Sequence, residues 1–242
     1  MRGPSEPEVT VFAGPTMATS SRARSLVRAH RLRRPVKRGD VTALVRAHKR
    51  PGVLAIVDGL FHESLAVGHA ELREALHRGW RVWGLSSMGA IRAREMASLG
   101  MRGFGRVFRR FVEEDDFQDD EVALLHESTP PYRPLTEPLV HVRAAAEHLL
   151  ARGLVDPDLA RRALSDLKAR WFGERTLRAS VAALSRSAVD HGEKRREVLH
   201  ELHPFDRFRV KTIDLEEFLE TRPWLLDDVP QIGPTARRTR RK

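Results

Sequence analysis

Three short apolar runs predict a sheet within the first hundred residues. They cover residues 9–13, 53–57 and 81–85, and they are followed by glycine, aspartate and serine respectively. The run at 53–57 is apolar at every position, which is typical of a parallel strand that helices cover on both faces. We therefore expect three buried strands, each ending at a small or polar residue.

Helical patterns separate these runs. Asp40 is placed to cap a helix that carries Val41, Leu44 and Val45. Helical spacing extends over residues 65–77, and a further helix over 88–99 is closed by Gly100. This alternation predicts an α/β fold with a small parallel sheet and flanking helices (Rossmann-like), followed by a helical C-terminal part.

Changes in composition and in hydrophobic periodicity along the chain indicate four segments. Residues 1–8 contain two prolines and no periodicity, so we expect a loose N-terminal leader before an α/β core over 9–135. Apolar repeats at helical spacing then predict a helical region over 136–222. Residues 223–242 end in a run of arginines, and we expect a disordered basic tail there.

Composition limits the chemistry of the chain. With 242 residues and no cysteine, the chain can bury a sizeable core but has no disulfide, thiolate metal site or cysteine nucleophile. No apolar run reaches the roughly 20 residues that span a bilayer, and the N-terminal segment has no continuous apolar stretch of the signal-peptide kind. We expect a cytoplasmic protein without a membrane partner.

The net positive charge of the chain is only weak evidence for a nucleic-acid partner. The formal net charge is +10, but arginine outnumbers lysine 37 to 6, a skew that a GC-rich genome also produces. Much of the excess lies in residues 22–50 and 237–242, and there is neither zinc-finger spacing nor an RNA-binding aromatic motif. Nucleic-acid binding is therefore the weaker interpretation.

A candidate site lies where the predicted strands end. Ligands of parallel α/β sheets lie beyond the carboxyl ends of the strands, so Gly14, Asp58-Gly59 and Ser86-Ser87 should surround one crevice. Ser87 is followed two residues later by Gly89, as in a nucleophile elbow, although Leu85 stands where a small residue is usual. The alternative is that Ser86 and Ser87 cap the following helix. No nucleotide-binding glycine motif is present, so we expect no cofactor in this chain.

Carboxylates cluster after the last of these helices. The runs 113–116 and 119–121 are acidic, and His126 follows them. Such a group could bind a cation or hold the histidine in position. The alternative is a solvated acidic loop followed by a helix cap at Asp119 or Asp120. We do not expect a metal site.

Several sequence blocks together are similar to one family. The blocks are residues 11–15, 38–40, 56–59, 69–71, 86–95, 100–103 and 119–123, which include VFAGP, IVDG, SSMGAIRA and DDEVA. In order and approximate spacing they resemble the TfuA-like family over roughly residues 9–150. The chain departs from that family at Gly68, where a tryptophan is common before the histidine, and at Ala70, where a lysine commonly follows it.

The resemblance implies a role beside another enzyme. TfuA-like proteins are partners of YcaO enzymes, which use ATP, with Mg, to activate a backbone amide so that sulfide can replace its oxygen. The implied process is peptide backbone thioamidation in ribosomally made natural products, with the precursor peptide held by the YcaO enzyme. The implied role of this chain is to supply sulfur or to activate the partner.

Combining the residues with the resemblance gives a hypothesis. Without cysteine the chain cannot carry a persulfide, so it would release sulfide from a donor such as a carrier protein with a C-terminal thiocarboxylate. Ser87 is the expected nucleophile, and His69 or, second, His126 the expected base. The groups expected to orient that base are Asp58, Asp120 or Glu121. The expected substrate-binding residues are Gly14, Gly59, Ser86, Met88, Gly89 and Arg92, with the N–H groups of Met88 and Gly89 as oxyanion donors.

Other interpretations stay open. Arg92 and Glu95 could form a structural ion pair instead of binding a carboxylate. The whole chain could be a noncatalytic module that docks on the YcaO enzyme, activates it and channels free sulfide. A third possibility is an independent serine hydrolase that acts on small esters without a partner.

Overall fold

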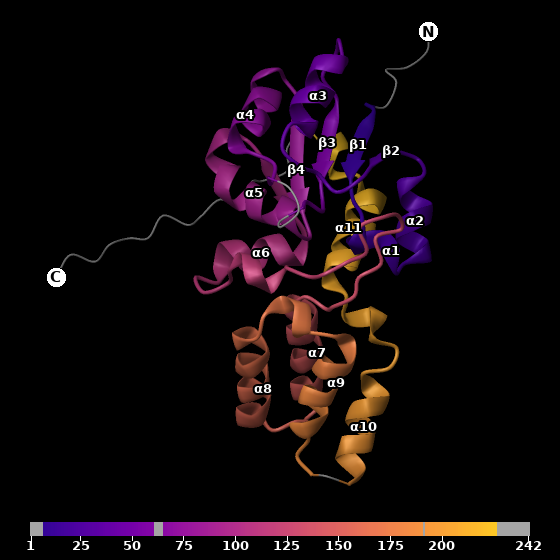
Figure 1. The fold of residues 1–242 in the computed structure, drawn as a ribbon, viewed down its shortest axis with the longest axis vertical. Coiled ribbons are helices and arrows are strands. Elements are labelled where there is room, and N and C mark those ends of the chain that lie inside the picture. The colour runs from indigo at the N-terminus through magenta and orange to yellow at the C-terminus, as the bar shows by residue number, and fades with distance from the viewer. Residues whose placement is uncertain (1–6, 61–64, 191, 227–242) are drawn as a thin grey trace, which may run out of the picture.

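A computed structural model describes residues 7–60, 65–190 and 192–226. Its centre is a five-stranded parallel sheet in the order β2-β1-β3-β4-β5. The strands are β1 (Val9–Phe12), β2 (Arg31–Arg33), β3 (Val53–Ile56), β4 (Arg81–Leu85) and β5 (Arg102–Phe104). The predicted α/β fold with a helical C-terminal part is therefore confirmed (Figure 1).

The three predicted strands form the middle of the sheet, and two further strands form its edges. β2 consists of exposed Arg31, Leu32 and Arg33, so its sequence lacks the apolar signal of a buried strand. β5 is only three residues long and contains Gly103. Edge strands of this kind pair through their main chain and carry little side-chain signal, which explains why the apolar pattern does not reveal them.

Helices cover both faces of the sheet, as the apolar strands require. Phe12, Leu54 and Ile56 point to the face covered by α3 (Asp40–Ala47), α4 (His69–His77) and α5 (Met88–Met96). Alternate strand residues point to the other face, which is covered by α2 (Ser21–Val27) and by α11 (Val210–Thr221). The short helix α1 (Pro15–Ala18) follows β1, and α6 (Gly105–Glu113) follows β5.

Two helix starts differ from the sequence expectation. The helix expected from residue 65 begins at His69, because Glu71 accepts a hydrogen bond from the main-chain N–H of Gly68 and fixes the start there. Asp40 is the first residue of α3 and not its cap. The same Glu71 carboxylate accepts N–H groups at the start of α3, so one buried side chain joins the beginnings of both helices.

The second half of the chain forms a separate helical layer and then returns to the sheet. Helices α7 (Leu139–Ala151), α8 (Pro157–Ala169), α9 (Leu177–Arg186) and α10 (Glu193–Glu201) share a core of their own below the sheet in Figure 1. α11, which the sequence grouped with these helices, packs on the sheet instead, where Phe218 and Trp224 are fully buried. Among the described residues, no helix is long and apolar enough to cross a membrane.

Candidate active site at the carboxyl end of the sheet

The strand order reverses direction between β1 and β3, and a small cavity lies just beyond the ends of these strands. Crevices at such reversal points are the usual ligand sites of parallel α/β sheets. The cavity has a volume of about 90 Å³, room for a few atoms of a ligand. It is lined by Pro15, Asp58, Gly59, Leu60, Ser87, Val122, Leu124, Leu125, His126 and Lys211. The structure thus brings together the predicted strand ends and His126.

Ser86 and Ser87 form a tight turn between β4 and α5. Ser86 has a φ of 65°, a conformation that residues other than glycine seldom adopt. The turn is closed by a hydrogen bond from the N–H of Ser87 to the carbonyl of Leu85 at 2.7 Å. Backbone strain of this kind is often found at functional sites. Here it places Ser87 directly before α5, with its side chain in the cavity wall.

The Ser87 hydroxyl does not cap the helix. Ser87 occupies the cap position, but its side chain makes no capping hydrogen bond. Within the described residues, that hydroxyl has no hydrogen-bond partner at all, although Ser87 is only 5 % exposed. An available hydroxyl at a strained strand-to-helix turn is what a nucleophile requires.

Gly89 serves close packing rather than oxyanion binding. A Cβ at this position would lie 1.7 Å from the carbonyl oxygen of Ile56, so only glycine lets α5 approach β3 this closely. Its N–H donates to the carbonyl of Val57 at 3.3 Å. This N–H is therefore already used within the fold, so the structure does not favour Gly89 as the expected oxyanion donor. The Met88 N–H has no acceptor within the described part of the chain and is the remaining candidate.

Asp58 holds the loop after β1. Its carboxylate accepts hydrogen bonds from the N–H groups of Gly14 at 2.8 Å and Thr16 at 3.0 Å, and from the Thr16 hydroxyl at 2.6 Å. These three donors occupy the carboxylate, and no histidine is among them. Asp58 thus lines the cavity and holds the main chain at Gly14 and Thr16, and no hydrogen bond from Asp58 to a histidine is seen in the described part of the chain.

Lys211 is a charged residue of the cavity wall that the sequence analysis did not predict. It is 1 % exposed, and its Nζ donates to the carbonyl of Val122 at 3.1 Å. Burial lowers the pKa of the Lys211 amine, while the carboxylates of Asp58 and Glu137 act in the opposite direction. A buried lysine of this kind can act as a base. Only the return of α11 to the sheet brings it to Ser87, and that tertiary step leaves no local pattern in the sequence.

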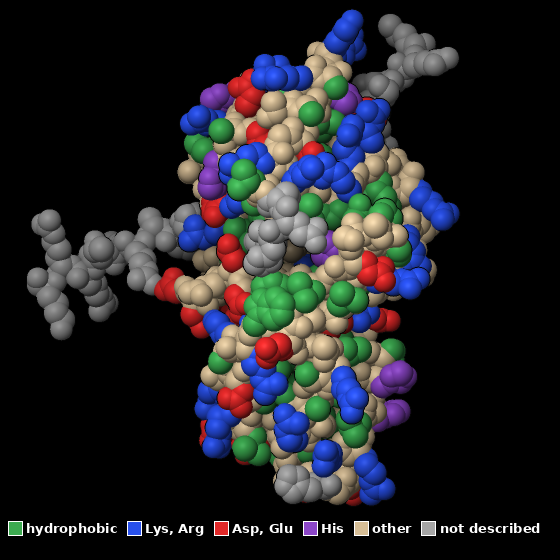
Figure 2. Space-filling view, in the orientation of Figure 1, with side chains coloured by type: hydrophobic (Ala, Val, Ile, Leu, Met, Phe, Trp, Pro, Cys, Tyr) green, Lys and Arg blue, Asp and Glu red, His purple; other side chains and the backbone are tan. Residues whose placement is uncertain are grey.

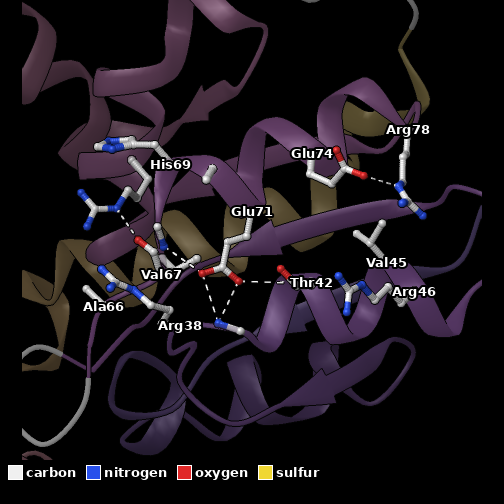
Figure 3. A pocket seen from close by; sticks show the side chains of 14 residues that line it. Arg38, Thr42, Val45, Arg46, Ala66, Val67, His69, Glu71, Glu74 and Arg78 are labelled. Carbon is white, nitrogen blue, oxygen red and sulfur yellow. Dashed lines mark hydrogen bonds and ion pairs between the residues drawn. The ribbon is translucent and has the colours of Figure 1, made fainter.

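The two candidate histidines lie in different places. His126 lines the cavity with Ser87, and its Nδ1 lies 2.6 Å from the carbonyl oxygen of Glu127. His69 is exposed, and its Nε2 pairs with Glu95 at 2.7 Å. It lines a separate groove of about 730 Å³ between α3 and α4 (Figure 3). Arg92 also lines this groove. The structure therefore brings His126, but not His69, to the same cavity as Ser87.

Arg92 forms the structural ion pair that was the alternative to carboxylate binding. Its Nη1 donates to Glu95 at 2.6 Å, and its Nε donates to the carbonyl of Val67 at 3.0 Å. In the same groove, Figure 3 shows Glu71 between α3 and α4, where its carboxylate accepts N–H groups at the starts of both helices. Arg92 thus joins α5 to the segment before α4 and is not part of the cavity wall.

Comparison with known proteins identifies the family of the chain. The family model described as TfuA-like protein matches residues 58–176. The chain belongs to the TfuA-like family. No curated protein sequence matches it. The matched region begins at Asp58 and includes Ser87 and His126, whereas Lys211 lies beyond its end.

In this TfuA-like protein, the two remaining predicted carboxylates are structural. Asp120 pairs with the buried Arg175 at 2.6 Å, and Glu121 accepts two hydrogen bonds from Arg143 at 2.8 Å each. Both link the segment before the cavity to the helical layer, so neither orients a histidine. In the described ranges, no group of three or more His, Asp or Glu side chains is arranged to hold a metal ion.

Proposed function

We propose that this TfuA-like protein supplies sulfide to a YcaO enzyme during peptide thioamidation, by hydrolysing a carrier protein that ends in a thiocarboxylate. The observation that supports this best is the Ser87 hydroxyl, which has no partner among the described residues, in a cavity that the buried Lys211 also lines. Nucleophile and base in one small enclosed site are the minimum for acyl transfer. The volume of about 90 Å³ suits the slender end of a chain better than a bulky ester.

The proposed chemistry has two steps. Ser87 Oγ attacks the thiocarboxylate carbon while its proton passes to the base. The base gives this proton to the sulfur as the C–S bond breaks, which releases hydrosulfide and leaves the base neutral again. The carrier is left joined to Ser87 as an ester. A water molecule, deprotonated by the same base, attacks this ester, and the proton returns to Ser87 Oγ. The net reaction converts a thiocarboxylate and water into a carboxylate and hydrogen sulfide.

Lys211 is our choice of base, and His126 is the second candidate. The amine is buried beside the cavity, and its lowered pKa favours the neutral form that accepts a proton. His126 lines the same wall, but its Nδ1 faces the Glu127 carbonyl. The free Met88 N–H at the start of α5 is the proposed oxyanion donor, because the helix dipole adds to its positive potential.

A noncatalytic role is the alternative function. The chain would then dock on the YcaO enzyme, shift it to an active conformation and channel free sulfide. The exposed Trp171 and Leu135, 59 % and 58 % accessible, favour such a contact because large apolar side chains at a surface often mark an interface. In this case Ser87 would serve only the turn in which it lies.

Sulfide release from a purified thiocarboxylated carrier separates these functions. We expect wild type to release sulfide, and Ser87→Ala and Lys211→Met to reduce the rate constant at least about 100-fold. Ser187→Ala is the matched control, since it removes another buried serine hydroxyl, which donates to Ala183 within the helical layer. That variant should keep the wild-type rate.

Two results would contradict the hydrolytic proposal. One is a wild-type protein that stimulates thioamidation by its partner with added sulfide but releases none from the carrier. The other is a Ser87→Ala variant with full release. Either result would leave docking as the function. If small esters were hydrolysed as fast as the carrier, the chain would be a general hydrolase instead.

A further inference from the structure

The main chain of Lys211 is held from both sides. Its carbonyl accepts the Ser86 hydroxyl at 2.8 Å, and its N–H faces His141 Nε2 at 3.4 Å. Lys211 is the second residue of α11, where an N–H group has no partner within the helix. Ser86 and His141 come from the β4–α5 turn and from α7, so two distant parts of the chain fix the start of α11.

The Ser86 hydrogen bond links the turn that carries Ser87 to the main chain of Lys211. Ser86 precedes Ser87 and holds the positive φ of the turn, and its hydroxyl is fully buried. The bond to Lys211 therefore ties the turn that presents Ser87 to the helix that carries the amine. A movement of either element would have to break this buried hydrogen bond.

The His141 contact depends on a third residue. To accept the Lys211 N–H, His141 must carry its own proton on Nδ1, and Glu137 lies 2.9 Å from that atom. Burial lowers the pKa of His141, which keeps the ring neutral and able to accept. Glu137 is held in turn by Arg209 at 2.6 Å, two residues before Lys211. The side chains of Glu137, His141 and Lys211 are buried, so these groups have no water to replace a lost partner.

We propose that Ser86 and the Glu137–His141 pair are positioning residues that place the Lys211 side chain against Ser87 by holding both polar groups of its main chain. This inference rests on the proposed hydrolytic function. Ser86, Glu137 and His141 lie outside the cavity lining, to which Ser87 and Lys211 belong. Their effect on the reaction therefore passes through the position and solvation of the lysine.

The titration of the Lys211 amine is the decisive readout. Protein labelled with ¹³C at the lysine ε-carbons carries only six lysines, and the loss of one signal in Lys211→Met assigns the residue. The charged or titratable groups around it are Asp58 after β3, Glu137 before α7, His141 on α7, His126 in the cavity and Arg209 before α11. Wild type should titrate below the ordinary lysine value, because burial disfavours the charged amine.

Four variants test the positioning role. Ser86→Ala and His141→Leu should raise the Lys211 midpoint, move the acid limb of the rate profile to higher pH, and lower kcat up to about 100-fold with KM unchanged. His141→Gln keeps an acceptor near the Nε2 position and should restore most of the rate. Ser86→Gly relieves the positive φ but lacks the hydroxyl, so it should be stable yet as slow as Ser86→Ala.

A control variant and two possible outcomes separate the positioning role from the proposed hydrolysis. His148→Leu removes a His–Glu pair of similar geometry in the helical layer, with Glu201 at 2.7 Å, and should leave the Lys211 midpoint unchanged. If Ser86→Ala and His141→Leu fold but keep the wild-type midpoint and kcat, the positioning role is overturned while hydrolysis stands. If wild type releases no sulfide from the carrier, the proposed function itself fails.

Discussion

At the scale of single residues, Ser87 is available because its neighbours carry the structural roles. Ser86 takes the unfavourable φ and bonds to Lys211, and Gly89 allows α5 to pack against β3. Gly84 does the same from β4, since a Cβ there would lie 2.0 Å from the carbonyl oxygen of Gly89. In the described part of the chain, the hydroxyl of Ser87 therefore makes no hydrogen bond that supports the fold.

Gly89→Ala should be among the most destabilising single substitutions in the chain. The added Cβ would overlap the Ile56 carbonyl, 1.7 Å away, and main-chain atoms cannot move aside as a side chain can. We expect a loss of about 3 kcal/mol or more in the free energy of unfolding, measured by urea denaturation. Gly68→Ala is the control, since its nearest neighbour atom would lie 3.9 Å away. A stable Gly89→Ala variant would contradict this account of the turn.

At the scale of elements, the sequence predicts a helix or strand correctly where that element has a clear pattern of apolar residues. β1, β3 and β4 are buried runs of apolar residues, and the rule for parallel sheets then places Gly14, Asp58 and Ser87 together. β2 and β5 escape prediction because edge strands need few apolar side chains. Lys211 and His141 escape it because their roles arise only when α7 and α11 pack beside the sheet. Charge pairs such as Asp120–Arg175 likewise depend on partners distant in sequence.

Glu137 links α7 to the segment before α11, and this link should weaken at low pH. Burial would raise the pKa of Glu137, but the hydrogen bonds from His141 and Arg209, together with the charge of Arg209, outweigh it and lower the pKa from 4.5 to about 2. A lowered folded-state pKa gives stability that is present above about 4.5 and lost as the pH falls towards about 2. The pKa of His141 is also lowered, so its contribution falls in the same direction, starting below its ordinary 6.5.

Glu137→Gln tests this link through pH. We expect the variant to lose on the order of 3 kcal/mol of unfolding free energy at pH 7 and to show a flatter dependence between about pH 5 and 2.5. Urea denaturation at a series of pH values measures both. Glu147→Gln breaks an ion pair whose carboxylate is 57 % exposed and should change little. Parallel pH curves for wild type and Glu137→Gln would show that this carboxylate does not stabilise the α7–α11 contact.

At the scale of the whole molecule, the site exists because the chain leaves the sheet and comes back. Residues 139–208 form a layer with its own core, and α11 then carries Lys211 to the sheet edge where β1, β3 and β4 end. Figure 2 shows Lys and Arg side chains spread over both parts of the visible face, with acidic side chains between them. The charge is therefore distributed on this face. Buried contacts, among them those of Arg175, help to connect the two layers.

Arg175 makes several of the buried hydrogen bonds that connect the two layers. It is fully buried and donates to the carboxylate and carbonyl of Asp120, and to the carbonyls of Leu167, Lys168 and Arg170. The Asp120 segment leads to Val122, whose carbonyl receives the Lys211 amine, so this arginine couples the helical layer to the cavity. Its loss should lower both the stability and the rate of sulfide release.

Arg175→Met should leave these buried acceptors unpaired and lower the free energy of unfolding by about 3 to 5 kcal/mol. Arg161→Met is the control, because that side chain is 75 % exposed and makes a local pair with Asp158. If the two layers unfold as one unit, far-ultraviolet circular dichroism and tryptophan fluorescence should give coincident transitions in wild type.

In Arg175→Met we expect the two transitions to separate. Trp80, Trp83 and Trp224 belong to the cores on the two faces of the sheet, so fluorescence reports mainly on that layer. Circular dichroism also follows helices α7 to α10 of the other layer, which should unfold first once the arginine no longer joins them to the Asp120 segment. Coincident transitions at wild-type stability would mean that contacts other than those of Arg175 join the layers, and the coupling of Arg175 to the cavity would then have to be abandoned.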